Sequence, residues 1–132
     1  MLIDFHTHAF PGKIAARAVS SLSQACGGLE PQTDGTLESL KAEMAKDGVT
    51  ISVVQSIATN PGQMSNVNNF AMEMNRDDAI VAFGSVHPDA PNALEELERI
   101  HAAGLRGVKF HPEYQNFYVD DEKLRPIYRK IS

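Results

Sequence analysis

The chain begins with the stretch Met1-Leu2-Ile3-Asp4-Phe5-His6-Thr7-His8. This pattern predicts a short strand that ends at His8. Alternate residues of a strand face the same way, so Asp4, His6 and His8 are expected on one face. Two imidazoles two residues apart on a rigid strand can bind one divalent metal ion. The alternative is a chance feature or the remnant of a tag, but the surrounding strand pattern and the acidic residue on the same face favour a metal.

Composition limits the classes of partner. The chain has 132 residues, with 12 lysines and arginines against 17 aspartates and glutamates, which gives a formal net charge of −5. This length suffices for one domain with a useful core. The acidic balance and the lack of a basic stripe argue against nucleic acid as the main partner. The single cysteine, Cys26, excludes an intramolecular disulfide and favours a reducing compartment. Cys26 is expected to be a packing residue at a helix end rather than a nucleophile.

No targeting or membrane segment is expected. The first residues lack the positive region and apolar stretch that are typical of a secretory signal. No apolar run approaches the ~18 residues that a membrane span requires. A cytoplasmic protein without a membrane partner is therefore the default expectation.

Strand and helix patterns alternate four times, which predicts a parallel α/β sheet with right-handed crossovers. The expected strands cover residues 1–8, 49–57, 80–86 and 105–110, and the second is expected to be buried on both faces. The expected helices cover residues 13–26, 36–47, 65–76, the segment from Pro91 to Gly104, and a last segment from Arg125. The apolar faces of these helices are expected to comprise, in chain order, Ile14, Ala18, Leu22 and Ala25; Leu37, Leu40 and Met44; Val67, Phe70, Ala71 and Met74; Leu94, Leu97 and Ile100; and Leu124, Ile127, Tyr128 and Ile131.

The last predicted helix would run for only about two turns before the sequence stops at Ser132. A complete (β/α)8 barrel typically needs ~250 residues. We therefore expect residues 1–132 to form four parallel βα units, the N-terminal half of a (β/α)8 TIM barrel that is truncated at its C-terminus. Its open edges predict that a missing half or a second copy closes the sheet. A self-contained doubly wound sheet is the alternative, but it does not explain the abrupt ending.

The histidines gather at one predicted edge. In parallel α/β folds the active site lies at the C-terminal ends of the strands. Four of the five histidines are expected there, and only His101 lies inside a predicted helix. The four are His6, His8, His87 and His111.

These motifs also carry a family resemblance. Asp4-Phe5-His6-Thr7-His8, at the end of the first strand, resembles the opening of the amidohydrolase superfamily of metal-dependent barrels. Gly84-Ser85-Val86-His87-Pro88 and Gly107-Val108-Lys109-Phe110-His111-Pro112 resemble its amidohydrolase-related branch (amidohydrolase 2), and the resemblance covers the whole chain. It implies a metal-dependent hydrolase or non-oxidative decarboxylase that acts on a small, carboxylated substrate.

The resemblance also implies roles for individual residues. His6 and His8 would bind one divalent ion, zinc or alternatively manganese. The family's further ligands are a histidine after strand five and an aspartate after strand eight. These and the family's principal catalytic histidine lie beyond this chain, so the catalytic residues stay unassigned. Whether the chain by itself is an enzyme is left open.

Lys109, His111 and His87 are expected to bind the substrate, and each has alternatives. A carboxylated Lys109 could bridge two metals, as in binuclear relatives, or Lys109 could form a buried ion pair with Asp4 or a neighbour. His111 could hydrogen-bond a metal ligand or cap backbone at a turn. His87 could simply position the next helix, and Asp4 could fix a backbone amide or an imidazole.

The loop from Pro112 to Val119 and the overall activity also leave alternatives. The aromatic residues Tyr114, Phe117 and Tyr118 could line a pocket for a flat ligand or serve as hydrophobic cover. A second reading of the whole chain is a catalytically incomplete half-barrel that associates with itself or with a complementary half. A phosphoesterase of another His-x-His family is a third, but its Ser-Asp-Gly-type motif is missing.

Overall fold

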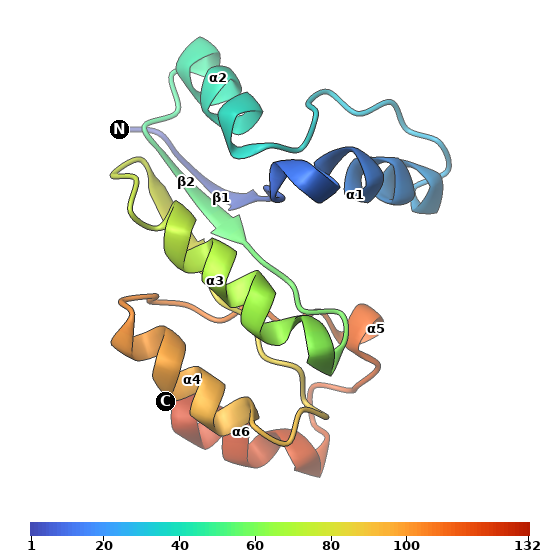
Figure 1. The fold of residues 1–132 in the computed structure, drawn as a ribbon, viewed down its shortest axis with the longest axis vertical. Coiled ribbons are helices and arrows are strands. Elements are labelled where there is room, and N and C mark those ends of the chain that lie inside the picture. Colours follow the sequence, from blue (N-terminus) through green and yellow to red (C-terminus); the bar gives the residue numbers. More distant parts are fainter. The chain divides into compact units, whose positions relative to one another are not determined.

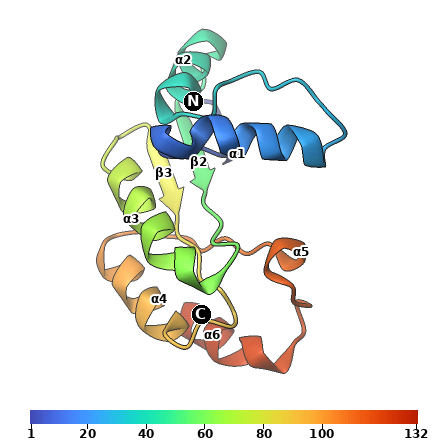
Figure 2. The same ribbon diagram turned by 45° about the vertical axis from the view of Figure 1, so that its right-hand side comes forward.

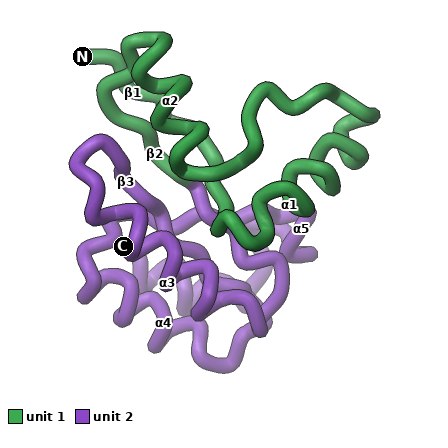
Figure 3. Tube along the Cα trace, turned by 45° about the horizontal axis from the view of Figure 1, so that its top comes forward, with its two compact units in different colours: residues 1–54 green, residues 55–132 purple.

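A computed structural model describes residues 1–132, and the chain is an α/β protein. It divides into two compact units, residues 1–54 and residues 55–132, which Figure 3 distinguishes by colour. None of the helices combines the length and the apolar character that crossing a bilayer requires.

The first unit contains a parallel pair of strands joined by two helices. Strand β1 (Ile3–Thr7) is followed by helices α1 (Gly12–Ala25) and α2 (Leu37–Asp47) and then by strand β2 (Ile51–Gln55) (Figure 1). β1 and β2 run parallel, as the alternation of strand and helix patterns predicts. The central residues of β2, Ser52 to Val54, are all buried, which confirms the expectation of a strand covered on both faces.

A β-bulge interrupts β1 between Asp4 and Thr7, in the segment that contains His6. Asp4 pairs with Ser52 and Thr7 with Val54, so β1 advances three residues while β2 advances two. The carboxylate of Asp4 accepts a hydrogen bond from the backbone N–H of His6 at 3.1 Å. Thr7 is buried, and its hydroxyl donates to the carbonyl of Val53 at 3.0 Å. The strict two-residue alternation expected across this stretch is therefore wrong, because the bulge adds a residue to β1.

Local signals set the ends of α2, whereas the buried face of α1 is not the expected one. The Thr36 hydroxyl accepts from the N–H of Ser39 at 3.1 Å, and Gly48 ends α2 with a φ of 72°. In α1, Ile14 is 50% exposed and Ala15 is buried. The loop at Gly35 approaches α1 so closely that a Cβ added to Gly35 would lie 2.4 Å from the Val19 side chain, so a larger residue does not fit there.

The second unit is built around strand β3 (Ile80–Phe83) and the helices that pack beside it. Helix α3 (Met64–Met74) contacts β3 and α4 (Ala93–Ala102), and α4 contacts α6 (Arg125–Ile131) (Figures 1 and 2). Three shorter helices complete the unit: η1 (Pro61–Gln63), α5 (Pro112–Gln115) and η2 (Glu122–Leu124). Its buried core includes Met64, Ala71, Met74, Ala82, Leu97, Ile100, Leu124 and Ile127.

The prediction of a fourth strand over residues 105–110 is wrong. This segment forms one isolated parallel bridge, between Gly84 and Val108. The N–H of Gly84 donates to the carbonyl of Gly107 at 3.0 Å, and the N–H of Lys109 donates to the carbonyl of Gly84 at 2.8 Å. Beyond the bridge, the hydroxyl of Ser85 donates to the carbonyl of Lys109 at 2.9 Å. A side chain thus replaces the next backbone pairing, and the expected set of four βα units is not confirmed.

Other expectations about burial are also wrong. Leu94 is 40% exposed, although it was expected on the inner face of α4, while Glu96 is 4% exposed. Tyr128 and Ile131 of α6 and the lone cysteine, Cys26, are exposed. In each helix the buried face is set by what packs against it, which the apolar spacing alone does not specify.

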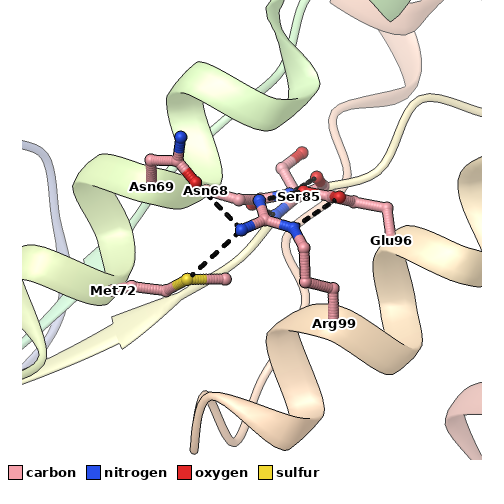
Figure 4. Close-up of polar contacts among 6 residues, drawn as sticks. All are labelled: Asn68, Asn69, Met72, Ser85, Glu96 and Arg99. Atoms are coloured by element: carbon pink, nitrogen blue, oxygen red, sulfur yellow. Dashed lines mark hydrogen bonds and ion pairs between the residues drawn. The ribbon is translucent and has the colours of Figure 1, made fainter.

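A buried polar network joins α3, α4 and the end of β3 (Figure 4). The amide nitrogen of Asn68 donates to the carbonyl of Ser85 at 2.9 Å and to the carboxylate of Glu96 at 2.7 Å. Its amide oxygen accepts from the N–H of Ser85 at 2.8 Å. Arg99 binds Glu96 through two nitrogens, at 2.8 and 2.6 Å. The network satisfies every polar group that Asn68 removes from water.

The charge on Glu96 follows from these contacts. Desolvation by burial is the largest single influence and opposes ionisation, but it is outweighed by other interactions. Hydrogen bonds from Arg99 and Asn68, together with the positive charge of Arg99, lower the pKa of Glu96 below its usual value. The buried carboxylate therefore stays ionised and needs both partners.

We predict that Asn68→Ala lowers the free energy of unfolding by about 3 kcal/mol, because it leaves the backbone of Ser85 and part of the Glu96 carboxylate without partners. Asn69→Ala is the matched control. Asn69 is exposed and accepts a single hydrogen bond from Arg99 at 2.9 Å, so its loss should cost less than about 1 kcal/mol. Urea unfolding followed by circular dichroism measures both, and equal losses would contradict the role given to Asn68.

Candidate functional site

The first unit brings His6 and His8 together. His6 lies in β1 and His8 directly follows it, and both side chains are exposed. The centroids of the two rings are 5.2 Å apart, and the ring planes are inclined by 62°. The bulge therefore changes the alternation of the strand without separating the two imidazoles.

The spacing of the two rings fits a shared metal ion. With Zn–N bonds of about 2.0–2.1 Å in a tetrahedral site, two coordinating imidazoles have ring centroids about 5 Å apart. The residues described include no group of three or more histidine, cysteine, aspartate or glutamate side chains suited to a metal. What this chain brings together is thus a pair of neighbouring imidazoles, His6 and His8.

Asp4 supports this pair rather than extending it. Its carboxylate accepts from the backbone N–H of His6, within the bulge. This is the backbone-fixing role that the sequence left open for Asp4, although the side chain is exposed rather than buried. By holding the amide of His6, Asp4 fixes the direction from which that side chain leaves the strand.

His87 lies in the second unit, at the corner that follows β3. It is 6% exposed. Its Nδ1 accepts a hydrogen bond from the backbone N–H of Asp89 at 3.2 Å. Desolvation by burial lowers the pKa of His87; the nearby carboxylate of Asp89 opposes this shift, and the charge of Lys123 adds to it. His87 is therefore a neutral imidazole that caps its own turn.

His111 has a similar arrangement at the next corner. It is the N-cap residue of α5, and its Nδ1 accepts from the backbone N–H of Tyr114 at 3.3 Å. The Tyr114 ring stacks on the imidazole with centroids 4.0 Å apart and an interplanar angle of 11°. The turn-capping alternative for His111 is thus realised in the structure, and Nε2 is the nitrogen that remains for a ligand.

One glutamine that the sequence analysis overlooked links these corners. Gln115 is 1% exposed, and its amide oxygen accepts from the N–H of His111 at 2.9 Å. Its amide nitrogen donates to the carbonyls of Ala58 at 2.9 Å and of Val86 at 3.0 Å. Three chain segments are therefore fixed by one side chain. The only signal in the sequence is its position four residues after a helix-capping residue, which is close to a capping-box spacing.

Ser85 and Lys109 lie beside the same segments. The Ser85 hydroxyl accepts from the N–H of Ala58 at 3.1 Å and donates to the carbonyl of Lys109. The Lys109 side chain is half-buried and takes part in no ion pair. The alternative of a lysine paired with an internal carboxylate is therefore not realised, and its cationic group is available for a ligand.

The aromatic residues of the neighbouring loop divide into different roles. Phe117 is buried and packs edge-on against Phe110, with centroids 6.0 Å apart. Tyr118 is exposed, and Tyr114 covers one face of His111. Phe117 is thus hydrophobic cover, and Tyr114 is the aromatic residue that contacts a candidate site residue.

The structure groups the sequence-predicted residues within units. His6 and His8 form a pair in the first unit. The segments that carry His87, Lys109 and His111 are joined in the second unit by hydrogen bonds to Ser85 and Gln115. The single fact shared by both groups is that each lies at or just after the C-terminal end of a strand or bridge.

Comparison with known proteins shows a similar fold and a family. A crystal structure of a probable 2-pyrone-4,6-dicarboxylic acid hydrolase from Acinetobacter baumannii, with citric acid bound, is similar in fold with a TM-score of 0.56 and 17% sequence identity. The likeness covers 98% of this chain and 45% of that one, so the chain spans about half the length of that hydrolase. No curated protein matches the sequence. Residues 3–132 match the amidohydrolase family, and the chain therefore belongs to that family.

Proposed function

We propose that this chain carries the metal-binding first strand and the substrate-binding corners of a metal-dependent hydrolase or non-oxidative decarboxylase. The observation that carries the proposal is the His6–His8 pair, whose rings are 5.2 Å apart at the end of β1 in a chain of the amidohydrolase family. Members of this family are typically metal-dependent. Zinc, or alternatively manganese, would be held by these two imidazoles and by ligands from outside the chain.

A divalent ion bound there would supply a Lewis acid that activates a water or polarises a substrate oxygen. The chain's own residues orient the site. Asp4 fixes the backbone of His6, and Gln115 fixes the corners that carry His87 and His111. Lys109 contributes a positive charge without an internal partner.

A small carboxylated substrate suits these groups. Lys109 and the two histidines offer a cation and imidazole N–H donors, which are typical partners of a carboxylate. The hydrolase of similar fold is described as acting on a dicarboxylic acid, and its crystal holds citric acid. Both facts support a carboxylate, and product analysis with a partner that completes the site would separate hydrolysis from decarboxylation.

We predict that His6→Ala abolishes zinc binding, because one remaining imidazole cannot chelate the ion. The protein is loaded with zinc, desalted and analysed for metal per chain. His101→Ala, which removes an exposed histidine of α4, is the control and should keep the metal content of the parent. An unchanged zinc content per chain in the His6→Ala protein would contradict the assignment of His6 as a metal ligand.

A second proposal concerns the partner. The chain associates with a second copy or with a complementary half through β1. This strand pairs with β2 on one side, and four of its five residues are exposed. Leu2 and Ile3 are 53% and 48% exposed. An exposed apolar strand is a ready template for pairing with another chain.

We predict that the chain is a dimer in solution and that Ile3→Lys shifts it to monomer, because a charge in β1 disfavours pairing. Ile14→Lys is the matched control, since Ile14 is equally exposed in α1 of the same unit. Light scattering after size exclusion gives the mass. A monomeric parent protein would contradict the pairing of two copies, and equal effects of the two substitutions would contradict a role for β1.

A further inference from the structure

His87 and His111 share one hydrogen-bonding arrangement. Each precedes a proline, and each uses Nδ1 to accept a backbone N–H from just beyond that proline. The donors are the amides of Asp89, at 3.2 Å, and of Tyr114, at 3.3 Å. This repeated geometry determines which ring nitrogen carries the proton in both histidines.

A backbone amide can only donate, so Nδ1 of each ring must carry a lone pair. A neutral imidazole has one N–H, which is then on Nε2. A metal bound through Nε2 would move that proton to Nδ1, and a protonated ring would carry N–H on both nitrogens. Either change would break the cap. The cap therefore favours the Nε2–H tautomer of each ring and disfavours metal binding through Nε2.

The surroundings of the rings reinforce this state. His87 is buried, and the same burial that lowers its pKa keeps it neutral. The charged groups near it, Asp89 and Lys123, form an ion pair with each other at 2.8 Å. His111 is held by Tyr114 against one face and by Gln115 at its backbone N–H. Neither imidazole is free to turn without losing a contact.

The Nε2 atoms of both rings are available to a ligand. Neither makes a hydrogen bond within the protein. The hydroxyl of Ser52 is the one fully buried side-chain oxygen or nitrogen without a partner, so the two Nε2 atoms are not fully buried. The Nε2–H groups are thus donors that reach solvent. Lys109 lies two residues from His111 with its charge unpaired. The segments that carry these donors and this cation are joined by the hydrogen bonds of Ser85 and Gln115.

We propose that His87 and His111 are fixed as Nε2–H hydrogen-bond donors that, with Lys109, bind a carboxylate of the ligand, and that neither one binds metal or acts as a general base. The carboxylate class rests on the proposed function, whereas the tautomers rest on the capping geometry alone. His87 and His111 therefore differ in kind from His6 and His8, although all four histidines lie at or just after the C-terminal end of a strand or bridge.

The tautomers can be read from long-range nitrogen–proton NMR correlations of the ¹⁵N-labelled full chain near neutral pH. We expect the Nε2–H form for His87 and His111. One equivalent of zinc should shift the ring signals of His6 and His8 and leave the other two unchanged. An Nδ1–H form, or zinc shifts at His87 or His111, would overturn the proposal. Absence of any zinc shift at His6 and His8 would refute only the metal proposal.

Paired substitutions separate the cap from the donor. His111→Asn places an amide oxygen near the position of Nδ1 and so keeps the cap, but it removes the Nε2–H donor. His111→Gln places its amide near Nε2 and gives up the cap. We expect His111→Asn to keep the melting temperature and to lose about tenfold in affinity for malonate. We expect His111→Gln to melt lower and to retain more of the affinity.

Malonate affinity is followed by its chemical-shift perturbations, and the same pair of substitutions is made at His87. The reverse pattern, with affinity lost in the Gln variant and kept in the Asn variant, would overturn the donor role. If malonate causes no shifts in the parent chain, the anion site is refuted, while zinc binding at His6 and His8 is unaffected by that outcome.

Discussion

The side-chain amide of Gln115 is the contact on which the corners of the second unit depend. Backbone groups beyond the last pairing of a sheet still need partners when they are buried. Gln115 supplies three of them at once, for the carbonyls of Ala58 and Val86 and the N–H of His111. Ser85 and Asn68 do the same for the neighbouring segments. Buried side-chain amides and a hydroxyl thus supply the hydrogen bonds that backbone groups need beyond the last strand pairing.

This replacement explains how corners with little regular structure can carry functional groups. A single bridge at Val108 would leave Lys109 and His111 on a loosely held segment. The hydrogen bonds from Ser85 and Gln115 fix the backbone on either side of Phe110. Each histidine then caps the turn that it begins, so its ring orientation follows from the backbone. Buried side-chain amides therefore fix the backbone, and the backbone in turn fixes the orientation of the imidazole rings.

In the first unit a side chain likewise pairs a backbone group outside the strand ladder, here at a bulge. An extra residue in β1 leaves a backbone N–H at His6 outside the ladder, and Asp4 accepts it. The two exposed imidazoles stay within the spacing of a shared ion. Bulges often re-aim side chains beside active sites. Here the bulge and the acidic residue act together, which gives Asp4 a structural role beside the two imidazoles.

Local sequence signals predicted the parts of the fold that depend on local physics. Thr36 and Gly48 mark α2, and the Val-rich stretch predicted a strand buried on both faces. The positions of His6 and His8 at the first strand end followed from the same patterns. Features that depend on neighbours far along the chain were missed. The bulge at Asp4, the buried face of α4 with Glu96 and the amide of Gln115 are each set by a partner that periodicity does not reveal.

We propose that His6 and His8 chelate one divalent ion as a pair. X-ray absorption at the zinc edge, on the full chain loaded with one equivalent of zinc, tests it most directly. We expect two imidazole nitrogens at about 2.0–2.1 Å, with oxygen ligands completing the coordination shell. A shell with three or four imidazoles would contradict it, because further histidines of this chain or of a second copy would then have joined the metal. A shell without imidazole would contradict the pair itself.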